Sequence, residues 1–352
     1  MPRLWLFDIE PHEQRYTGEW QKTLPQQLHA AMYLKGQKAW SLEVVSGHQT
    51  SGKTSIGGFL DFAETNAYKA AQVSEFVAMV QSGTVRDSDR VLFADAWHPG
   101  VIQCRYIADL LDIDLSIDVM WHAGSYDPWD QLGQKVSNKA WSYAFEKAVF
   151  QASDTNYFAT KFHWEMFHDA LRPDQPERAK TVGWPMEYLC PLLEPLAGST
   201  EKDTILFPHR LASEKMPKAL EILRDHLPQY RIVFAQEQAL TKQQYHQELA
   251  RALVVFSASL QETLGIGTFE GLLAGAVPIV PNRLSYTEIY GDRAYPSEWS
   301  ANEQAVADHA RQLAQFIEAA IQSRDPSTLE ELAVSVGDEF FNGRELYRHV
   351  LR

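Results

Sequence analysis

Residues 257–281 read SASLQETLGIGTFEGLLAGAVPIVP, and this stretch decides the fold. It begins where an apolar run, residues 253–256, ends, and that run predicts a buried strand. A glycine-rich turn at 264–267 follows, and we expect a helix over 268–274 and a second strand over 277–280. A strand, a glycine turn and a helix in this order build an anion site. The glycines let the backbone approach a ligand, and the first N–H groups and dipole of the helix favour phosphate.

Two carboxylates flank this turn. Glu262 precedes the glycines and Glu270 lies on the predicted helix after them, so both can face a ligand above the helix start. Because they would repel a phosphate, they are better suited to accept hydrogen bonds from hydroxyl groups. A phosphate with hydroxyls on both sides describes a nucleotide sugar. The alternative is an ordinary strand, turn and helix with exposed glutamates.

The same residues resemble a known signature. Glu262 and Glu270 with Gly265 between them resemble the E-x-x-G-x-x-x-x-E motif of retaining glycosyltransferases of the GT-B fold (glycosyltransferase family 4-like). The following Gly275-Ala276-Val277-Pro278 fits the family's exit into a strand. In that family the second glutamate binds the nucleotide ribose, while the first glutamate and the turn amides hold the donor sugar. The resemblance therefore implies these donor-binding residues: Glu262, Leu264, Gly265, Ile266, Gly267 and Glu270.

Length and composition limit the number of domains and the classes of partner that we expect. The chain has 352 residues, which favours two domains, and its 45% hydrophobic content is ordinary for a globular protein. Two cysteines, Cys104 and Cys190, offer neither a disulfide framework nor a metal cluster, so we expect a cytoplasmic protein. We find neither a signal peptide nor an apolar run long enough to span a bilayer, so no membrane partner is expected. The net charge of −14 argues against a generally basic surface for nucleic acid.

The N-terminal part predicts a doubly wound α/β domain. An apolar strand at 4–7, a helix through Trp20 and a strand at 40–45 imply a parallel sheet. In GT-B enzymes the loop after the first strand faces the cleft between the domains. Here that loop carries Asp8, Glu10 and Arg15, which we assign to the acceptor side, although a solvated loop is an equal alternative.

Residues 47–54, GHQTSGKT, match the P-loop pattern of nucleotide hydrolases and kinases letter by letter. A P-loop must lead directly into a helix that holds phosphate. Residues 55–59 are instead glycine-rich, and a helical pattern resumes only at about residue 66. A P-loop hydrolase or kinase using Lys53 and magnesium remains the alternative from another class, because the strand at 91–95 ends in an aspartate.

Further candidates follow the later strands of this domain. His122 comes directly after a strand at 115–120, and it is similar to the family's cleft histidine near the reacting sugar. A packed structural histidine is the alternative. Trp97, Trp121 and Tyr126 are acceptor-side candidates that could stack on a ring, or they could be core.

The second domain opens with a strand at 204–207 and the turn Pro208-His209-Arg210-Leu211-Ala212-Ser213-Glu214-Lys215. This resembles the family's G-R-L-x-x-E-K turn and implies that Arg210 and Lys215 bind the donor diphosphate. Two cations there would stabilise the leaving group, so we count them with His122 and Glu262 as catalytic. The family's glycine is His209 here, which puts the backbone at that point in doubt.

We expect the GT-B fold, with two Rossmann-like doubly wound domains facing each other across a cleft. The expected boundaries are 1–190 for the acceptor-side domain, a linker over 191–203, 204–330 for the nucleotide-sugar domain, and a C-terminal helix in 331–352 that could cross back to the first domain. Residues 182–186 resemble the strand that enters the crossing between domains. The oligomeric state is left open.

The expected reaction is transfer of a glucose-like sugar from a nucleoside diphosphate sugar, with UDP as the expected carrier, to a hydroxyl with retention. No metal or other cofactor is required, because no Asp-x-Asp motif lies at a credible donor site. Short patterns around Asp8, His122 and Phe207 resemble a branch encoded by bacteriophages. That branch suggests a 5-hydroxymethylated pyrimidine in double-stranded phage DNA as the acceptor. Arg15, Lys53, Arg86 and Arg90 would then contact phosphates, whereas the net charge favours a small-molecule, glycan or protein acceptor.

Overall fold

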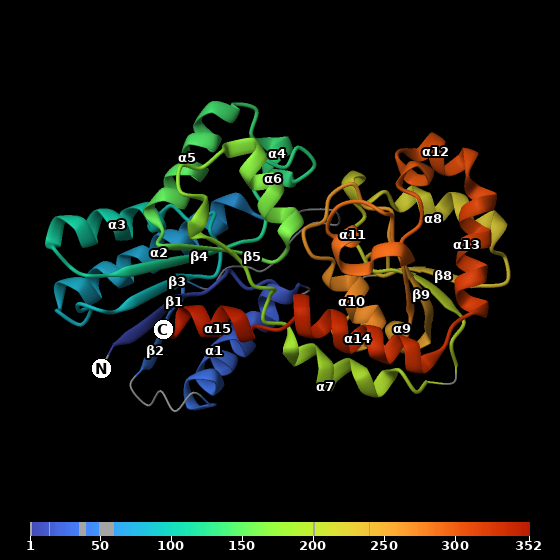
Figure 1. Ribbon diagram of the computed structural model, residues 1–352, viewed down its shortest axis with the longest axis horizontal. Helices are drawn as coiled ribbons and strands as arrows, with labels where there is room; N and C mark the ends of the chain where they lie inside the picture. Colours follow the sequence, from blue (N-terminus) through green and yellow to red (C-terminus); the bar gives the residue numbers. More distant parts are fainter. Residues whose placement is uncertain (1, 14, 35–39, 49–59, 200, 239) are drawn as a thin grey trace. The chain divides into compact units, whose positions relative to one another are not determined.

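The computed structural model describes residues 2–13, 15–34, 40–48, 60–199, 201–238 and 240–352. By its internal contacts the chain divides into two compact units (Figure 1). Among the described residues, the first unit comprises the chain up to Pro185 together with Gly343–Arg352, and the second comprises Met186–Asn342.

The first unit is built on a six-stranded parallel sheet in the order β2-β1-β3-β4-β5-β6. Its strands are β1 (Arg3–Phe7), β2 (Ser41–Val45), β3 (Arg90–Phe93), β4 (Ser116–Trp121), β5 (Thr155–Phe158) and β6 (Ala179–Thr181). The strand order reverses direction after β2, so right-handed crossovers place helices on both faces. The predicted α/β doubly wound class is confirmed for this unit.

The helices of the first unit separate into two groups. They are α1 (Tyr16–Leu34), α2 (Phe62–Gln81), α3 (Gly100–Leu111), α4 (Gln131–Lys135), α5 (Lys139–Ala152), α6 (Lys161–Leu171) and α15 (Arg344–Val350). Helix α1 contacts α15, while α2 contacts α3, α3 contacts α5, and α5 contacts α6 (Figure 1).

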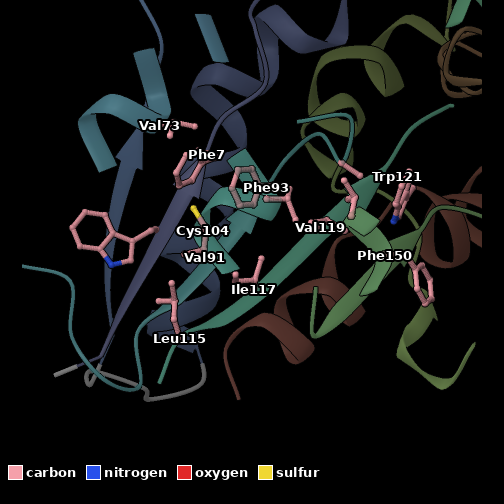
Figure 2. Close-up of a cluster of buried hydrophobic side chains, with 14 of the residues drawn as sticks. Phe7, Val73, Val91, Phe93, Cys104, Leu115, Ile117, Val119, Trp121 and Phe150 are labelled. Atoms are coloured by element: carbon pink, nitrogen blue, oxygen red, sulfur yellow. The ribbon is translucent and has the colours of Figure 1, made fainter. Parts of the chain in front are cut away.

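Alternate residues of the strands form the core on the face of α2, α3 and α5. Figure 2 shows Phe7 of β1, Phe93 of β3 and Ile117, Val119 and Trp121 of β4 in one buried cluster. The spacing of two matches the alternation of side chains along a strand. The remaining strand residues, among which Asp118 lies between Ile117 and Val119, therefore point to the other face.

The second unit has a four-stranded parallel sheet in the order β10-β9-β7-β8. Its strands are β7 (Thr204–Phe207), β8 (Arg231–Phe234), β9 (Ala252–Phe256) and β10 (Val277–Ile279). Its helices are α7 (Cys190–Leu193), α8 (Pro217–Leu223), α9 (Lys242–Arg251), α10 (Ile266–Leu273), α11 (Ser285–Tyr290), α12 (Glu303–Asp308), α13 (Ala310–Gln322) and α14 (Pro326–Phe340). Helix α10 packs against α7 and α14, whereas α8 packs against α12 and α13 (Figure 1).

Two local predictions differ from the structure. The strand expected over 182–186 is instead β6, because Gly183 adopts a left-handed φ of 68° and Pro185 follows it. The residues expected to form a linker after 191 include α7 and a 3₁₀ turn, Glu194–Leu196, since Pro191 and Pro195 each stand in a first helical turn. Helix α9 begins at a capping box formed by Thr241 and ends before β9.

Arg90 joins the C-terminal helix to the first sheet and lies beside the buried carboxyl group of Asp118. Asp118 is 1% exposed, and its Oδ2 lies 3.4 Å from Nη1 of Arg90 on the neighbouring strand. The same Arg90 nitrogen donates to the carbonyl oxygens of His349 and Val350, at 2.7 and 3.2 Å. Burial raises the pKa of Asp118 to about 7, although the Arg90 charge acts in the opposite direction.

This pair predicts a pH-dependent stability. Between the ordinary carboxyl pKa of 3.8 and about 7, folded Asp118 keeps a proton that the unfolded chain has released. The free energy of unfolding should therefore fall as pH rises through this window, by about 2–4 kcal/mol for this one group. We expect the Asp118→Asn variant to lack that part of the slope in urea unfolding at pH 4 to 8. Identical pH slopes in the variant and the wild type would contradict the assignment.

Candidate functional site

The glycine turn lies at the carboxyl end of β9, where α10 begins. Gly265 adopts φ 82°, a left-handed conformation that suits glycine, and it serves as the N-cap of α10. The helix starts at Ile266, two residues before the predicted start, so Ile266 and Gly267 contribute the first amides of the helix. These amides have no acceptor within the helix. A Cβ at Gly267 would lie 3.1 Å from the ring of Pro208, so a glycine here allows α10 to approach the loop after β7.

Glu262 forms an ion pair with Lys215 across this turn. Nζ of Lys215 donates to Oε2 of Glu262 at 3.2 Å and to Oε1 of Gln261 at 3.1 Å, and also to the Gln261 carbonyl. Burial by itself would raise the pKa of Glu262, but the Lys215 charge and neighbouring hydrogen bonds outweigh it and lower that pKa. Glu262 is therefore an ionised acceptor next to a cation.

The loop after β7 supplies the second predicted cation. Nη2 of Arg210 donates to Oε1 of Glu214 at 2.8 Å, and Glu214 is fully buried. His209 is also buried, and burial together with the Lys215 charge lowers its pKa to about 3, so its imidazole is neutral. Since β7 and β9 are neighbours in the sheet, this loop and the glycine turn lie at the same edge. The structure thus brings Lys215 and Glu262 into direct contact.

Glu270 is held by two side chains of α9. The hydroxyl of Tyr245 donates to its Oε2 at 2.8 Å, and Nζ of Lys242 lies 3.4 Å from its Oε1. The Glu270 side chain is 9% exposed. Sequence reasoning missed both partners, because they precede Glu270 by more than twenty residues and no spacing rule links them.

Tyrosines and an arginine support the backbone around the turn. Tyr286 donates to the hydroxyl of Ser257 at 3.0 Å and Tyr295 donates to the Ser257 carbonyl at 2.9 Å. Tyr290 bonds Thr268 at 3.2 Å. Arg283 donates to the carbonyls of residues 258 and 259 at 2.7 and 2.9 Å. These contacts fix the segment that carries Glu262, and the sequence offered no signal for them beyond their position after the motif.

The candidates of the first unit follow the carboxyl ends of its strands. Nε2 of His122 lies 2.7 Å from the Ala94 carbonyl, which can only accept, so this nitrogen carries the proton. Burial lowers the pKa of His122, so the ring is neutral and Nδ1 accepts the hydroxyl of Tyr16 at 2.9 Å. Both ring nitrogens are therefore engaged, and a sugar hydroxyl could bond His122 only by displacing Tyr16 or the carbonyl.

Asp8 and Glu10 are buried rather than open to solvent. Asp8 accepts the hydroxyl of Tyr68 at 2.5 Å, and burial raises its pKa. Glu10 accepts the hydroxyl of Thr65. Both partners belong to α2, so the two carboxylates connect the loop after β1 to that helix. Arg15, just before α1, is half-buried.

The three aromatic candidates separate into two kinds. Trp121 is fully buried in the core of Figure 2. Tyr126 is 4% exposed and its hydroxyl lies 2.6 Å from Nε2 of His163. Core packing is therefore what the structure shows for these two, and the stacking role is wrong for them. Trp97 is half-buried, and its indole donates to Glu146 at 2.8 Å.

Sequence reasoning also missed an ion pair after β3. Nζ of Lys69 lies 2.7 Å from Oδ2 of Asp95 and also donates to the Trp97 carbonyl. Burial opposes ionisation of Asp95, but the Lys69 charge outweighs it, so the pKa of Asp95 is lowered. The aspartate that ends this strand was considered only as a magnesium ligand of a P-loop.

Other predictions concern the P-loop-like segment, the cations and a metal. Of residues 47–54, only Gly47 and His48 are described, so the P-loop prediction and Lys53 lie outside the described residues. Arg86 is exposed, whereas Arg90 is engaged by Asp118 and α15 and is not available to a phosphate.

In the described part of the chain, no group of three or more His, Cys, Asp or Glu side chains could hold a metal ion. No described helix is both long and apolar enough to cross a membrane.

No protein-family model and no curated protein sequence matches this chain. Solved structures do match along its whole length. HepE from Anabaena, in complex with UDP-glucose, is 12% identical with a TM-score of 0.59, covering 100% of this chain and 99% of that one. Sucrose-phosphate synthase from Thermosynechococcus elongatus is also 12% identical, with a TM-score of 0.58 and the same coverage. The lipopolysaccharide outer core galactosyltransferase WaaB is 10% identical with a TM-score of 0.58, over 99% and 98% of the two chains.

These similarities concern the fold. Two parallel-sheet α/β units together with these neighbours confirm the predicted GT-B fold.

Proposed function

We propose that this chain is a glycosyltransferase that uses a nucleoside diphosphate sugar, with the second unit as its donor-binding part. One observation carries the proposal: the ionised Glu262, paired with Lys215, lies three residues before Gly265, the N-cap of α10, and Glu270 lies four residues after the first residue of that helix. The amides and Lys215 suit a diphosphate, and the two carboxylates suit hydroxyls on its two sides. The GT-B fold supports this assignment.

UDP-glucose is the donor we propose. HepE, which shares the fold over nearly its whole length, was solved with UDP-glucose. We assign Glu270 to the ribose, Glu262 to the sugar, and the amides of the glycine turn to the phosphates and sugar.

The proposed reaction retains the configuration at the anomeric carbon and needs no metal ion. The oxygen of the acceptor hydroxyl forms a bond to that carbon while the bond to the diphosphate oxygen breaks. Negative charge passes to the leaving diphosphate, which takes up the proton of the acceptor hydroxyl. Lys215 and Arg210 would stabilise that charge. The E-x-x-G-x-x-x-x-E resemblance supports retention.

The proposed acceptor is a 5-hydroxymethylated pyrimidine in phage DNA. Its support is the resemblance of short segments to the phage branch and the half-buried Trp97, which could stack on an extruded base. Of the four cations expected to contact phosphates, Arg86 is exposed and Arg15 is half-buried. A small-molecule, glycan or protein acceptor is favoured by the net charge of −14.

An acceptor assay distinguishes these substrates. UDP-glucose is offered with DNA containing hydroxymethylcytosine, DNA containing hydroxymethyluracil, and unmodified DNA, and the digested nucleosides are then analysed by mass spectrometry. We expect a hexose mass on one hydroxymethylated base and none on unmodified DNA. Donor turnover without a mass shift on any base would reject the DNA acceptor and leave the transferase assignment standing.

A further inference from the structure

Helix α9 holds the carboxylate of Glu270 in one orientation. Tyr245 donates to Oε2 at 2.8 Å and Lys242 lies 3.4 Å from Oε1, so each oxygen has one partner from the same helix. The two partners are three residues apart and therefore share a helix face. Nζ of Lys242 also lies 5.6 Å from the centre of the Tyr245 ring, within the range of a cation–π contact.

With these two partners, the Glu270 carboxylate still has lone-pair positions that can accept hydrogen bonds from a ligand. A carboxylate has about four lone-pair positions, two on each oxygen. Tyr245 and Lys242 occupy one on each, so one position remains on each oxygen. Two neighbouring hydroxyl groups on a five-membered ring can donate to both oxygens at once, whereas a single hydroxyl can donate to only one.

We propose that Tyr245 and Lys242 are positioning residues that orient Glu270 to grip both hydroxyls of a ribose, and thereby make the site select ribonucleotides over deoxyribonucleotides. The inference rests on the proposed function, because it takes Glu270 as the ribose-binding group. It adds a selectivity to that function and assigns it to two side chains outside the motif.

The burial of Glu270 makes this orientation effective. Its side chain is 9% exposed, and that of Lys242 is 34% exposed. Little water can therefore replace a missing hydroxyl at the carboxylate, and a hydrogen bond to a charged group is worth about 1.5–3 kcal/mol, or roughly tenfold to a hundredfold in affinity. A ligand without the 2′-hydroxyl should lose affinity by about that factor.

The test measures dissociation constants of the whole chain for UDP and for 2′-deoxyuridine diphosphate by calorimetry. We expect the wild type to bind UDP at least about tenfold more tightly than the deoxy compound. Tyr245→Phe and Lys242→Met should each lower this ratio about threefold to tenfold, mainly by weakening UDP. Tyr245→Phe keeps the aromatic ring, so it still tests the proposal if Lys242→Met folds poorly. Thermal melting checks that both variants are folded.

Two control variants remove the same functional groups at positions away from Glu270. Lys218→Met removes a lysine that pairs with Glu303 at the same 3.4 Å on an exposed surface of the same unit, and Tyr33→Phe removes an exposed tyrosine hydroxyl. Both should keep the wild-type ratio. If Tyr245→Phe and Lys242→Met also keep it, or weaken both ligands equally, the positioning role is wrong and the proposed function stands. If the wild type binds neither UDP nor its deoxy analogue, the proposed function itself fails.

Discussion

Replacing Lys215 with methionine should lower the rate of sugar transfer by about a hundredfold to a thousandfold, the range seen when one charge-stabilising donor is removed from a site. Lys215 is 8% exposed on its side chain and is the cation that contacts Glu262. In the proposed reaction it would face the leaving diphosphate. The measurement is the turnover of UDP-glucose at saturating donor, compared with that of the Lys218→Met variant, which loses an exposed lysine of the same unit.

The Lys215→Met variant needs a check on folding. Removing the cation leaves the ionised Glu262 without its charged partner, and we expect a loss of about 1–3 kcal/mol in the free energy of unfolding. The double variant Lys215→Met/Glu262→Gln should recover much of that stability and remain inactive. A Lys215→Met protein that is folded and turns over donor at the wild-type rate would contradict the assigned role.

Replacing Glu270 with alanine should weaken UDP binding by about 1–3 kcal/mol, the value of hydrogen bonds to a charged group. The physical reason is that the ribose hydroxyls lose a fixed acceptor. Calorimetry with UDP measures the change, and Glu303→Ala, which removes an exposed carboxylate of the same unit, is the control. Equal UDP affinity in the wild type and the Glu270→Ala variant would show that Glu270 does not contact the nucleotide.

The fold could be predicted from the sequence because the first strand of each domain is apolar and is bounded by turn residues. Strand β7 has the predicted bounds, and the strand, glycine turn and helix order at residues 253–273 is present as expected. The start of α10 was placed too late, since Gly265 in a left-handed conformation initiates the helix. Ile266 and Gly267, which were predicted to be part of the turn, therefore belong to the first turn of α10.

The side-chain contacts of the site could not be predicted as well, because the partners are distant from one another in the sequence. The contacts of Glu270 with α9 and of Lys215 with Gln261 depend on how helices and loops pack on neighbouring strands. Burial also depends on register: Trp121 ends a strand whose alternate residues face the core, so its ring packs inward. A sequence pattern could not distinguish that ring from an exposed one such as Trp141, which is 50% exposed.

The most direct measurement is a calorimetric titration of the whole chain with UDP-glucose in excess chelator, repeated with added magnesium and with ATP. The account predicts saturable binding of UDP-glucose at one site, unchanged by magnesium, and no binding of ATP with or without the metal. Binding of ATP with magnesium, together with no binding of UDP-glucose, would contradict it and favour a nucleotide hydrolase or kinase.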